Sequence, residues 1–482
     1  MNETSIQIES DKAAAGSPVR KGRVDPKSVA VLPFVNVSSD PEHEYLSDGF
    51  TEDLITALSQ VDGLRVPART SCFAFKGKSE DVRQIGARLG VAAILEGSIR
   101  KAGGKLRLTA QLISVASGFH LWSDKFDCAM PDIFSIQDEI IRSIVDALKV
   151  RLAVPAGAPL VKRPTQSTEA YQLYLKGRYF WNHRGHGLKK GSSFFEIALL
   201  EDPNFALAYT GLADTYNLLG FYGRLPSFEA GTKAKAAALK ALELDSSLAE
   251  AHSSLGFARL IFDWDLAAAE MEFRAALALN GQYVLAHNWY ARLLSITGKH
   301  SQAIARDKRA IEIDPLSTYT NMHLGWILLN ARRYDEAVRQ LLWALEMNPL
   351  GLRARCLLGQ AYLFQGKIAE AIVELQKAKA NSRQNEWAVA ALGHAQAVAG
   401  DRAEAEAALS ELTARSEREP VRPTLFALVH AGLGETDKAI AWLNEACRER
   451  DCWMPLVKPD PAFDGLRADS RFAGIMKDIG PP

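Results

Sequence analysis

The sequence is poor in cysteine, has no long apolar run and shows no excess of charge of either sign. Its five cysteines are odd in number and scattered, which argues against a disulfide framework and fits a reducing cytoplasm. No uncharged run reaches the roughly 20 mostly apolar residues that a membrane-spanning helix needs. Lys plus Arg and Asp plus Glu both total 57, and this zero formal net charge argues against general binding to nucleic acid or to an anionic membrane.

The start of the chain also lacks the apolar block of a secretory signal, and it carries acidic residues such as Glu3, Glu9 and Asp11. We therefore expect a disordered tail at 1–27 and a cytoplasmic protein. The whole chain is 48% hydrophobic and 24% charged, which is typical of a soluble protein with two or three domains.

A 34-residue period organises the chain from about residue 264 to residue 446. Alanines in phase with this period are Ala269, Ala303, Ala337, Ala371, Ala405 and Ala439. Gly325, Gly359 and Gly393 keep the same step. This period resembles that of the tetratricopeptide repeat family, in which two antiparallel helices form each unit.

The spacing has a physical cause. A small residue such as Gly325 is expected where the two helices of a unit approach each other. Pro315 and Pro349 each follow a second helix and end it, because proline cannot donate the backbone hydrogen bond that a helix needs. One unit cannot bury its apolar face alone, so stacked units form a superhelix with a concave side. We predict a repeat array at 168–448, with about eight units of which the first are irregular, and a C-terminal capping segment at 449–482.

A smaller α/β unit is predicted at 28–153, followed by a linker at 154–167. The second arm of a hairpin around Gly103-Gly104 alternates apolar and polar residues, which is typical of a half-buried strand. The expected elements are strands at 28–34, 64–69, 93–101, 105–113 and 119–127 and helices at about 48–61, 82–89 and 133–152. The predicted fold class is a small α/β sandwich domain followed by an all-α tetratricopeptide superhelix, or α-solenoid.

Several segments of this unit resemble the TolB amino-terminal-domain-like family of bacterial proteins. The matching segments are 28–34, 45–52, 94–98, 108–113 and 120–122. In that family the α/β unit is commonly followed by tetratricopeptide repeats, and it is often preceded by a class III adenylate cyclase domain or a winged-helix DNA-binding domain. Only about 27 residues stand in front of the unit here, so we do not carry cyclase or DNA-binding activity over. The resemblance supplies no catalytic residue.

Short fragments that could suggest other chemistry have simpler interpretations. Gly77-Lys78-Ser79 ends like a phosphate-binding loop, but Cys72 stands at the required earlier glycine position. His183 and His186 have no Cys or carboxylate partner nearby in the sequence. The acidic residues from Asp40 to Asp53 are interpreted as charge at a helix start and a solvated loop, ahead of a metal or acid/base site. We predict no metal site, no cofactor and no catalytic residue.

The concave groove is the candidate binding site, because the first helix of each unit lines the inside in this repeat class. Counting within the frame places these residues there: Asn288, Arg292, Tyr319, Met322, Trp326, Arg353, Gln360, Trp387 and His394. Aromatic, Met and Arg side chains carry much of the binding energy at protein interfaces. The alternative, in which Met322 or Trp326 packs against a neighbouring helix, stays open.

Three functions follow. The first is a non-catalytic scaffold whose groove binds a partner protein or peptide in bacterial signalling or complex assembly. The second is a regulatory subunit that acts in trans on an adenylate cyclase or a transcriptional regulator. The third is an enzyme or ligand sensor that uses the α/β unit, which a buried cleft with paired ionisable groups near Asp48 or Glu96 would favour. The partner, the pathway and the oligomeric state are not readable from the sequence.

Overall fold

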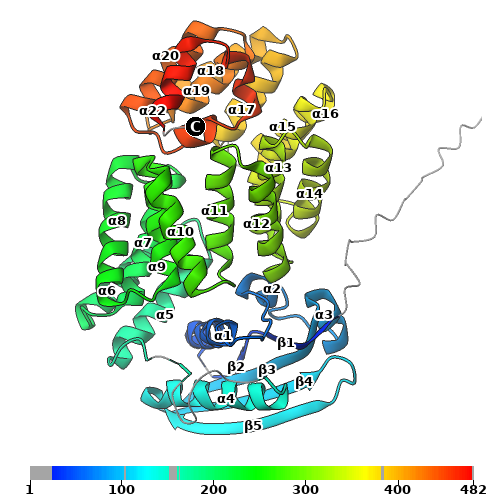
Figure 1. Cartoon of the computed structure of the whole chain (residues 1–482), viewed down its shortest axis with the longest axis vertical. Coiled ribbons are helices and arrows are strands. Elements are labelled where there is room, and N and C mark those ends of the chain that lie inside the picture. The colour runs from blue at the N-terminus through cyan, green and yellow to red at the C-terminus, as the bar shows by residue number, and fades with distance from the viewer. Residues whose placement is uncertain are drawn as a thin grey trace, which may run out of the picture.

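A computed structural model of the chain shows a mixed sheet domain joined to a long helical array (Figure 1). The structure describes residues 24–38, 40–102, 105–150, 160–161, 163–381 and 385–479. The Gly103-Gly104 turn, most of the predicted tail and half of the predicted linker lie outside these residues. Among the described helices, none combines the length and the apolar character needed to cross a membrane.

The N-terminal domain is built on one sheet. Its strands are β1 (Asp25–Val31), β2 (Val35–Asn36), β3 (Val91–Ala102), β4 (Lys105–Ser114) and β5 (His120–Ala129). The order is β1-β3-β4-β5, with β1 and β2 parallel to β3 and the two later pairs antiparallel. The alternation predicted in β4 is confirmed, because Leu106, Leu108, Ala110 and Leu112 are buried.

Helices α1 (Glu44–Ser59), α2 (Arg69–Phe73), α3 (Val82–Leu89) and α4 (Ile133–Ala147) complete this domain. Asp81 begins α3 by accepting a hydrogen bond from the backbone N–H of Arg83, and Gly90 ends it in the left-handed conformation, at φ 67°. Helix α1 lies between the sheet and the helical array (Figure 1). It therefore forms part of the boundary between the two domains.

The strand predicted at 64–69 is wrong. Only one parallel bridge forms, between Ser28 and Arg65, and Arg69 already begins α2. Pro67 lies in the middle of the segment and cannot donate to a ladder. The next backbone N–H, that of Ala68, donates instead to the carbonyl of Ile313 in the helical array, at 2.9 Å. This segment therefore joins the domains rather than extending the sheet.

Eight antiparallel helix pairs follow within the described residues. They are α5 (Thr168–Asn182) with α6 (Gly187–Glu201), α7 (Ala206–Phe221) with α8 (Ser227–Leu244), α9 (Ala249–Ala258) with α10 (Leu266–Leu279), α11 (Val284–Ile296) with α12 (His300–Ile313), α13 (Thr318–Asn330) with α14 (Tyr334–Met347), α15 (Leu352–Phe364) with α16 (Ile368–Asn381), α17 (Glu386–Val398) with α18 (Arg402–Ser416) and α19 (Pro423–Gly432) with α20 (Thr436–Arg448). A π-helical turn, η3 (Arg259–Asp263), extends α9.

The chain ends with the short helices α21 (Met454–Val457), η4 (Pro461–Leu466) and α22 (Ser470–Asp478). The six in-phase alanines all lie in second helices and are fully buried. A Cβ added to Gly325 would come within 2.6 Å of Leu341, and one added to Gly359 within 2.5 Å of Leu375. The prediction that these glycines mark close helix approaches is therefore confirmed.

The turn inside each of the last six pairs passes through one residue in the left-handed conformation. Glycine fills four of these in-phase positions, at Gly298, Gly366, Gly400 and Gly434. Trp264 and Arg332 fill the other two, with φ values of 60° and 61°. Both of these side chains contact the C-terminal segment, as the next section describes, so the two exceptions to glycine mark where the chain closes on itself.

The two domains share a continuous hydrophobic core. Tyr171 and Leu175 of α5 belong to the same buried cluster as the sheet, and a Cβ on Gly49 of α1 would come within 2.6 Å of Leu175. Further along the array, the carboxylate of Asp314 accepts hydrogen bonds from the Ser71 backbone N–H at 2.8 Å and its hydroxyl at 2.6 Å. The sheet domain is thus fixed to the first pair and to the turn between the fourth and fifth pairs.

Candidate functional site

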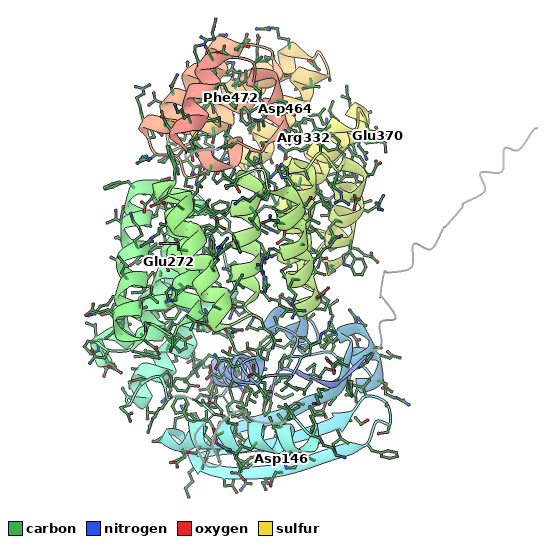
Figure 2. All side chains as sticks on the ribbon, in the orientation of Figure 1. Asp146, Glu272, Arg332, Glu370, Asp464 and Phe472 are labelled. Carbon is green, nitrogen blue, oxygen red and sulfur yellow. The ribbon has the colours of Figure 1, made fainter. Side chains whose placement is uncertain are left out.

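The inner face of the array is formed by the first helix of each pair. Successive first helices contact one another from α7 to α19, and their inner side chains face two hollow regions. One lies next to the sheet domain. The other is lined in part by residues of the C-terminal segment 449–479. Figure 1 shows this segment at the end of the helices opposite the sheet, and Figure 2 shows the same arrangement with side chains. We call the first region the interdomain chamber and the second the capped pocket.

The C-terminal segment reaches across the array to the second helix pair. The indole Nε1 of Trp453 donates to the carbonyl of Phe221 at 3.2 Å, and the Trp453 ring lies 5.8 Å from that of Trp387. Arg422, which precedes α19, links this segment to the same pair, because it donates to Asp451 and to the carbonyl of Gly220, each at 2.8 Å. The predicted cap therefore covers the last apolar face and also closes the inner face between the second and seventh pairs.

Trp264 and Arg332, the two turn residues that stand in place of glycine, contact this segment from outside the pocket. Arg332 forms an ion pair with Asp464 at 2.6 Å and donates to the carbonyl of Pro459 at 2.7 Å (Figure 2). The guanidinium of Arg450 lies over the ring of Trp264, with its carbon 4.5 Å from the ring centroid. These contacts explain why a bulky side chain replaces glycine at both turns.

The capped pocket has a volume of about 90 Å³ and a lining of aromatic, aliphatic and basic side chains. The lining residues are Phe221, Arg292, Met322, His323, Trp326, Arg353, Leu357, Gln360, Trp387, Thr424, Leu425, Leu428, Trp453, Leu456, Val457, Asp460 and Phe463. Burial lowers the pKa of Arg353, and burial raises the pKa of Asp460 to about 6. An ionised side chain in this pocket therefore costs free energy unless an opposite charge or a hydrogen-bond partner lies beside it.

Four polar side chains, one of them the lining residue His323, join the fourth and fifth pairs beside this pocket. Asp307, which is fully buried, accepts from the side-chain amide of Asn288 at 2.9 Å and lies 2.7 Å from Nδ1 of His323. Thr320 donates to Asn288 at 3.3 Å. Burial lowers the pKa of His323, although the Asp307 carboxylate opposes that effect. Asn288 is thus engaged within the core rather than free to meet a partner.

The structure divides the nine predicted groove residues among three environments. Those lining the capped pocket are Arg292, Met322, Trp326, Arg353, Gln360 and Trp387. Asn288 and Tyr319 line the interdomain chamber. His394 lines neither region; it is 2% exposed, and burial lowers its pKa to about 4. Met322 and Gln360 are also buried, so much of the expected open groove is covered by the chain itself. Binding of a partner by these residues stays a prediction.

The interdomain chamber consists of two adjoining cavities of about 840 and 390 Å³. Both domains line it, and Glu52 of α1 is one of the charged residues in its wall. The Glu52 carboxylate forms ion pairs with Arg178 of α5 and, at 3.0 Å, with Arg69 of α2. Arg178 also lies 3.8 Å from Asp214 of α7. A network of ion pairs therefore joins the sheet domain to the first two helix pairs along the wall of the chamber.

The interpretation of the acidic residues near Asp48 as solvated is wrong for three of them. Asp48 is 4% exposed and pairs with Lys76 at 2.5 Å. Glu52 forms the network just described, and Asp53 accepts a hydrogen bond from the hydroxyl of Tyr171. Burial raises the pKa of Asp53 to about 6. Glu52 and Asp53 contact a helix that lies more than a hundred residues away in the sequence, so local charge patterning could not reveal these contacts.

Sequence reasoning also missed Phe221, His323 and the C-terminal segment as parts of the inner face. The one available signal was the replacement of glycine at Trp264 and Arg332 in an otherwise regular turn. His183 is exposed, and its Nδ1 lies 2.7 Å from the carbonyl oxygen of Tyr179. Within the described parts of the chain, no group of three or more His, Cys, Asp or Glu side chains is arranged to hold a metal ion.

Comparisons with known proteins match each part separately. The second domain of HilA/YgeH-like transcriptional regulators matches residues 25–147, and the tetratricopeptide repeat family matches residues 323–386. "Putative adenylate cyclase 3" of Rhizobium meliloti is 39% identical over 235 residues, which are 48% of this chain and 40% of that protein. Transcriptional regulator HilA of Salmonella typhimurium is 24% identical over 174 residues, 36% of this chain and 31% of that protein. The chain spans less than half the length of these relatives.

Solved structures align with the helical array only loosely. Yeast Tom70 gives a TM-score of 0.41 at 14% identity and covers 66% of this chain and 69% of its own. YrrB, described as a TPR protein with an unusual peptide-binding site, gives 0.29 at 25% identity, with 40% and 95% covered. The TolB-like character expected from the sequence stays a prediction. The chain carries tetratricopeptide repeats in its C-terminal region, behind an N-terminal domain that resembles the second domain of HilA/YgeH-like transcriptional regulators.

Proposed function

We propose that this chain is a non-catalytic protein-interaction scaffold that binds a partner protein or peptide on the inner face of its repeat array, in bacterial signalling or complex assembly. The observation that carries the proposal is the interdomain chamber, which both domains line and which is wide enough for a chain segment. The capped pocket is already covered by residues 449–479, so the partner site lies at the chamber end of the inner face.

The chamber wall offers apolar and aromatic surface to a bound peptide. Tyr283, Leu285 and Tyr319 of the fourth and fifth pairs supply this surface. Aromatic side chains of this kind contribute strongly at protein interfaces. Among the predicted groove residues, Tyr319 is the one that combines partial exposure with a place in this wall.

The same chamber contains paired ionisable groups, which is the feature expected of an enzyme or a ligand sensor. The pairs cross the domain boundary, as in Glu52 with Arg178, and Asp53 accepts a hydrogen bond from the hydroxyl of Tyr171. Groups paired in this way hold the domains together, and they are engaged with one another rather than with a substrate. This arrangement supports the non-catalytic proposal over an enzyme.

A second candidate is a regulatory subunit that acts in trans on an adenylate cyclase or a transcriptional regulator. Two relatives favour it, one named as an adenylate cyclase and one as a transcriptional regulator. Both share less than half of their length with this chain. In this version of the function, the partner bound in the chamber is the effector chain itself.

Quantitative co-purification from the source cell tests the scaffold. Tyr283→Glu places a charge in the chamber wall, and Phe228→Glu places the same charge on α8, where Phe228 is 78% exposed outside the chamber. We expect a partner retained by the wild type and by Phe228→Glu to be lost from Tyr283→Glu, with equal helix content in all three proteins. Equal recovery with Tyr283→Glu would contradict binding in the chamber. A cyclase or a transcription regulator as the retained partner would select the second candidate.

A further inference from the structure

Two arginines contact one aromatic ring in the capped pocket. The guanidinium carbon of Arg292 lies 4.8 Å from the ring centroid of Phe221, and that of Arg353 lies 4.9 Å from the same centroid. Arg292 also lies 5.3 Å from the ring of Trp326, and Arg353 lies 5.6 Å from that of Trp387. The rings hold the two cations in place, and the cations lie close enough to repel each other.

Neither guanidinium has a carboxylate partner among the described residues. Arg292, which is 4% exposed, makes one long contact of 3.5 Å to the hydroxyl of Tyr319, and its buried Nε has no partner there. Asp460 is the acidic residue in the pocket lining, but its carboxylate accepts from the backbone N–H of Ala462 instead. Arg292 is buried and Arg353 is half-buried, and two such cations without a counter-charge are costly, which favours a bound anion.

A third polar group in the lining also lacks a partner. His323 is 1% exposed, and its Nδ1 lies 2.7 Å from the Asp307 carboxylate, which fixes the ring proton on that nitrogen. Nε2 is buried without a hydrogen-bond partner among the described groups and, in this neutral tautomer, is an acceptor. Gln360, in the next pair, lines the same pocket with an amide that can donate or accept. The pocket therefore offers cationic donors and one neutral acceptor.

We propose that the capped pocket binds a small oxyanion that also carries a hydroxyl group, such as a hydrogenphosphate or a small hydroxy acid. The anionic oxygens accept from Arg292 and Arg353, the hydroxyl donates to Nε2 of His323, and any apolar part of the ligand lies against Trp387. A planar guanidinium matches the two oxygens of a phosphate or a carboxylate.

The size and position of the pocket limit the ligand. A volume of about 90 Å³ holds a few non-hydrogen atoms and excludes a folded segment of another protein. Trp453 and Leu456 of the C-terminal segment form one wall, so a bound anion would also help to hold this segment closed. The inference does not depend on partner binding, because the capped pocket and the interdomain chamber have no lining residue in common.

Isothermal titration calorimetry of the full chain tests the site with four probes. Inorganic phosphate and lactate carry both the charge and the hydroxyl, propionate lacks the hydroxyl, and lactamide lacks the charge. We expect saturable binding of phosphate or lactate, at least tenfold weaker binding of propionate and no binding of lactamide. Phosphate alone would identify a phosphate site, and lactate alone would identify a carboxylate site. No saturable binding of either probe would overturn the proposal.

Matched variants locate the binding. Arg353→Gln removes one pocket cation, whereas Arg339→Gln removes an exposed cation from the outer helix α14. We expect at least a tenfold loss of affinity in the first variant and none in the second; equal affinity in both would overturn the site. Gln360→Glu supplies an internal counter-charge and should abolish anion binding while raising the melting temperature. If Arg353→Gln fails to fold, binding by Gln360→Glu with wild-type affinity would still overturn the proposal.

Discussion

Arg332 and Asp464 lie 132 residues apart in the sequence and form an ion pair at 2.6 Å (Figure 2). Arg332 reaches Asp464 from a turn in which glycine is the usual residue, so its backbone adopts the left-handed conformation at a cost of roughly 1–2 kcal/mol. The ion pair and the hydrogen bond to Pro459 offset that cost and fasten the C-terminal segment across the array.

Substitution of Arg332 separates these two effects. Arg332→Ala loses the contacts and keeps the left-handed strain, whereas Arg332→Gly loses the contacts and relieves the strain. We expect the free energy of unfolding of the glycine variant to exceed that of the alanine variant by about 1 kcal/mol in urea titrations. A glycine variant that is no more stable than the alanine variant would show that the backbone at this turn is not strained.

The phase of the repeats predicts where a larger side chain is not tolerated. Gly359→Leu should overpack the α15–α16 crossing at Leu375 and lower the free energy of unfolding by roughly 1–3 kcal/mol or more. Gly474→Ala is the matched control, because a Cβ there meets no atom within 4 Å. A melting temperature unchanged by Gly359→Leu would mean that the assigned phase is wrong.

The pair formed by Asp53 and Tyr171 predicts a pH dependence of stability. Burial raises the pKa of Asp53 from 3.8 to about 6, so the folded chain holds this proton where the unfolded chain has released it. Unfolding then releases a proton between about pH 4 and pH 6, and the contribution of Asp53 to stability falls as the pH rises through this window. Asp53→Asn carries no such proton, so its stability relative to the wild type should rise from about pH 4 to about pH 7.

Chemical denaturation at both pH values measures this change, and Asp62→Asn provides an exposed control in the same domain. The control should keep a constant stability relative to the wild type. If Asp53→Asn behaved like the control, the Asp53 carboxyl would not be held protonated at the domain boundary.

The sequence predicted those features that repeat or alternate. Ala337 and Gly359 are placed by a fixed period, and Leu108 is placed by alternation within a strand, so each can be read without knowing the rest of the fold. The sequence could not show that residues 64–69 fail to form a strand. The backbone N–H of Ala68 donates to the carbonyl of Ile313, which lies in the other domain. Contacts between segments that are distant in the sequence produce no periodic pattern of residues from which they could be predicted.

The same limit applies to the candidate site. The period placed Arg292 and Arg353 on the inner face, and the structure brings them together in one pocket. It could not show that Trp453 returns from the end of the chain to cover them, because that return depends on the curvature of the stacked pairs. The break in the glycine pattern at Arg332 was visible, but its partner Asp464 was not.

Site-specific photocrosslinking tests the central proposal most directly. A benzophenone side chain at Tyr283 reports on the interdomain chamber, and the same group at Phe228 reports on the outer surface of α8. In the source cell, the scaffold proposal predicts one discrete crosslinked partner from position 283 and none of that partner from position 228. A partner that crosslinks from position 228 and not from position 283 would contradict binding on the inner face.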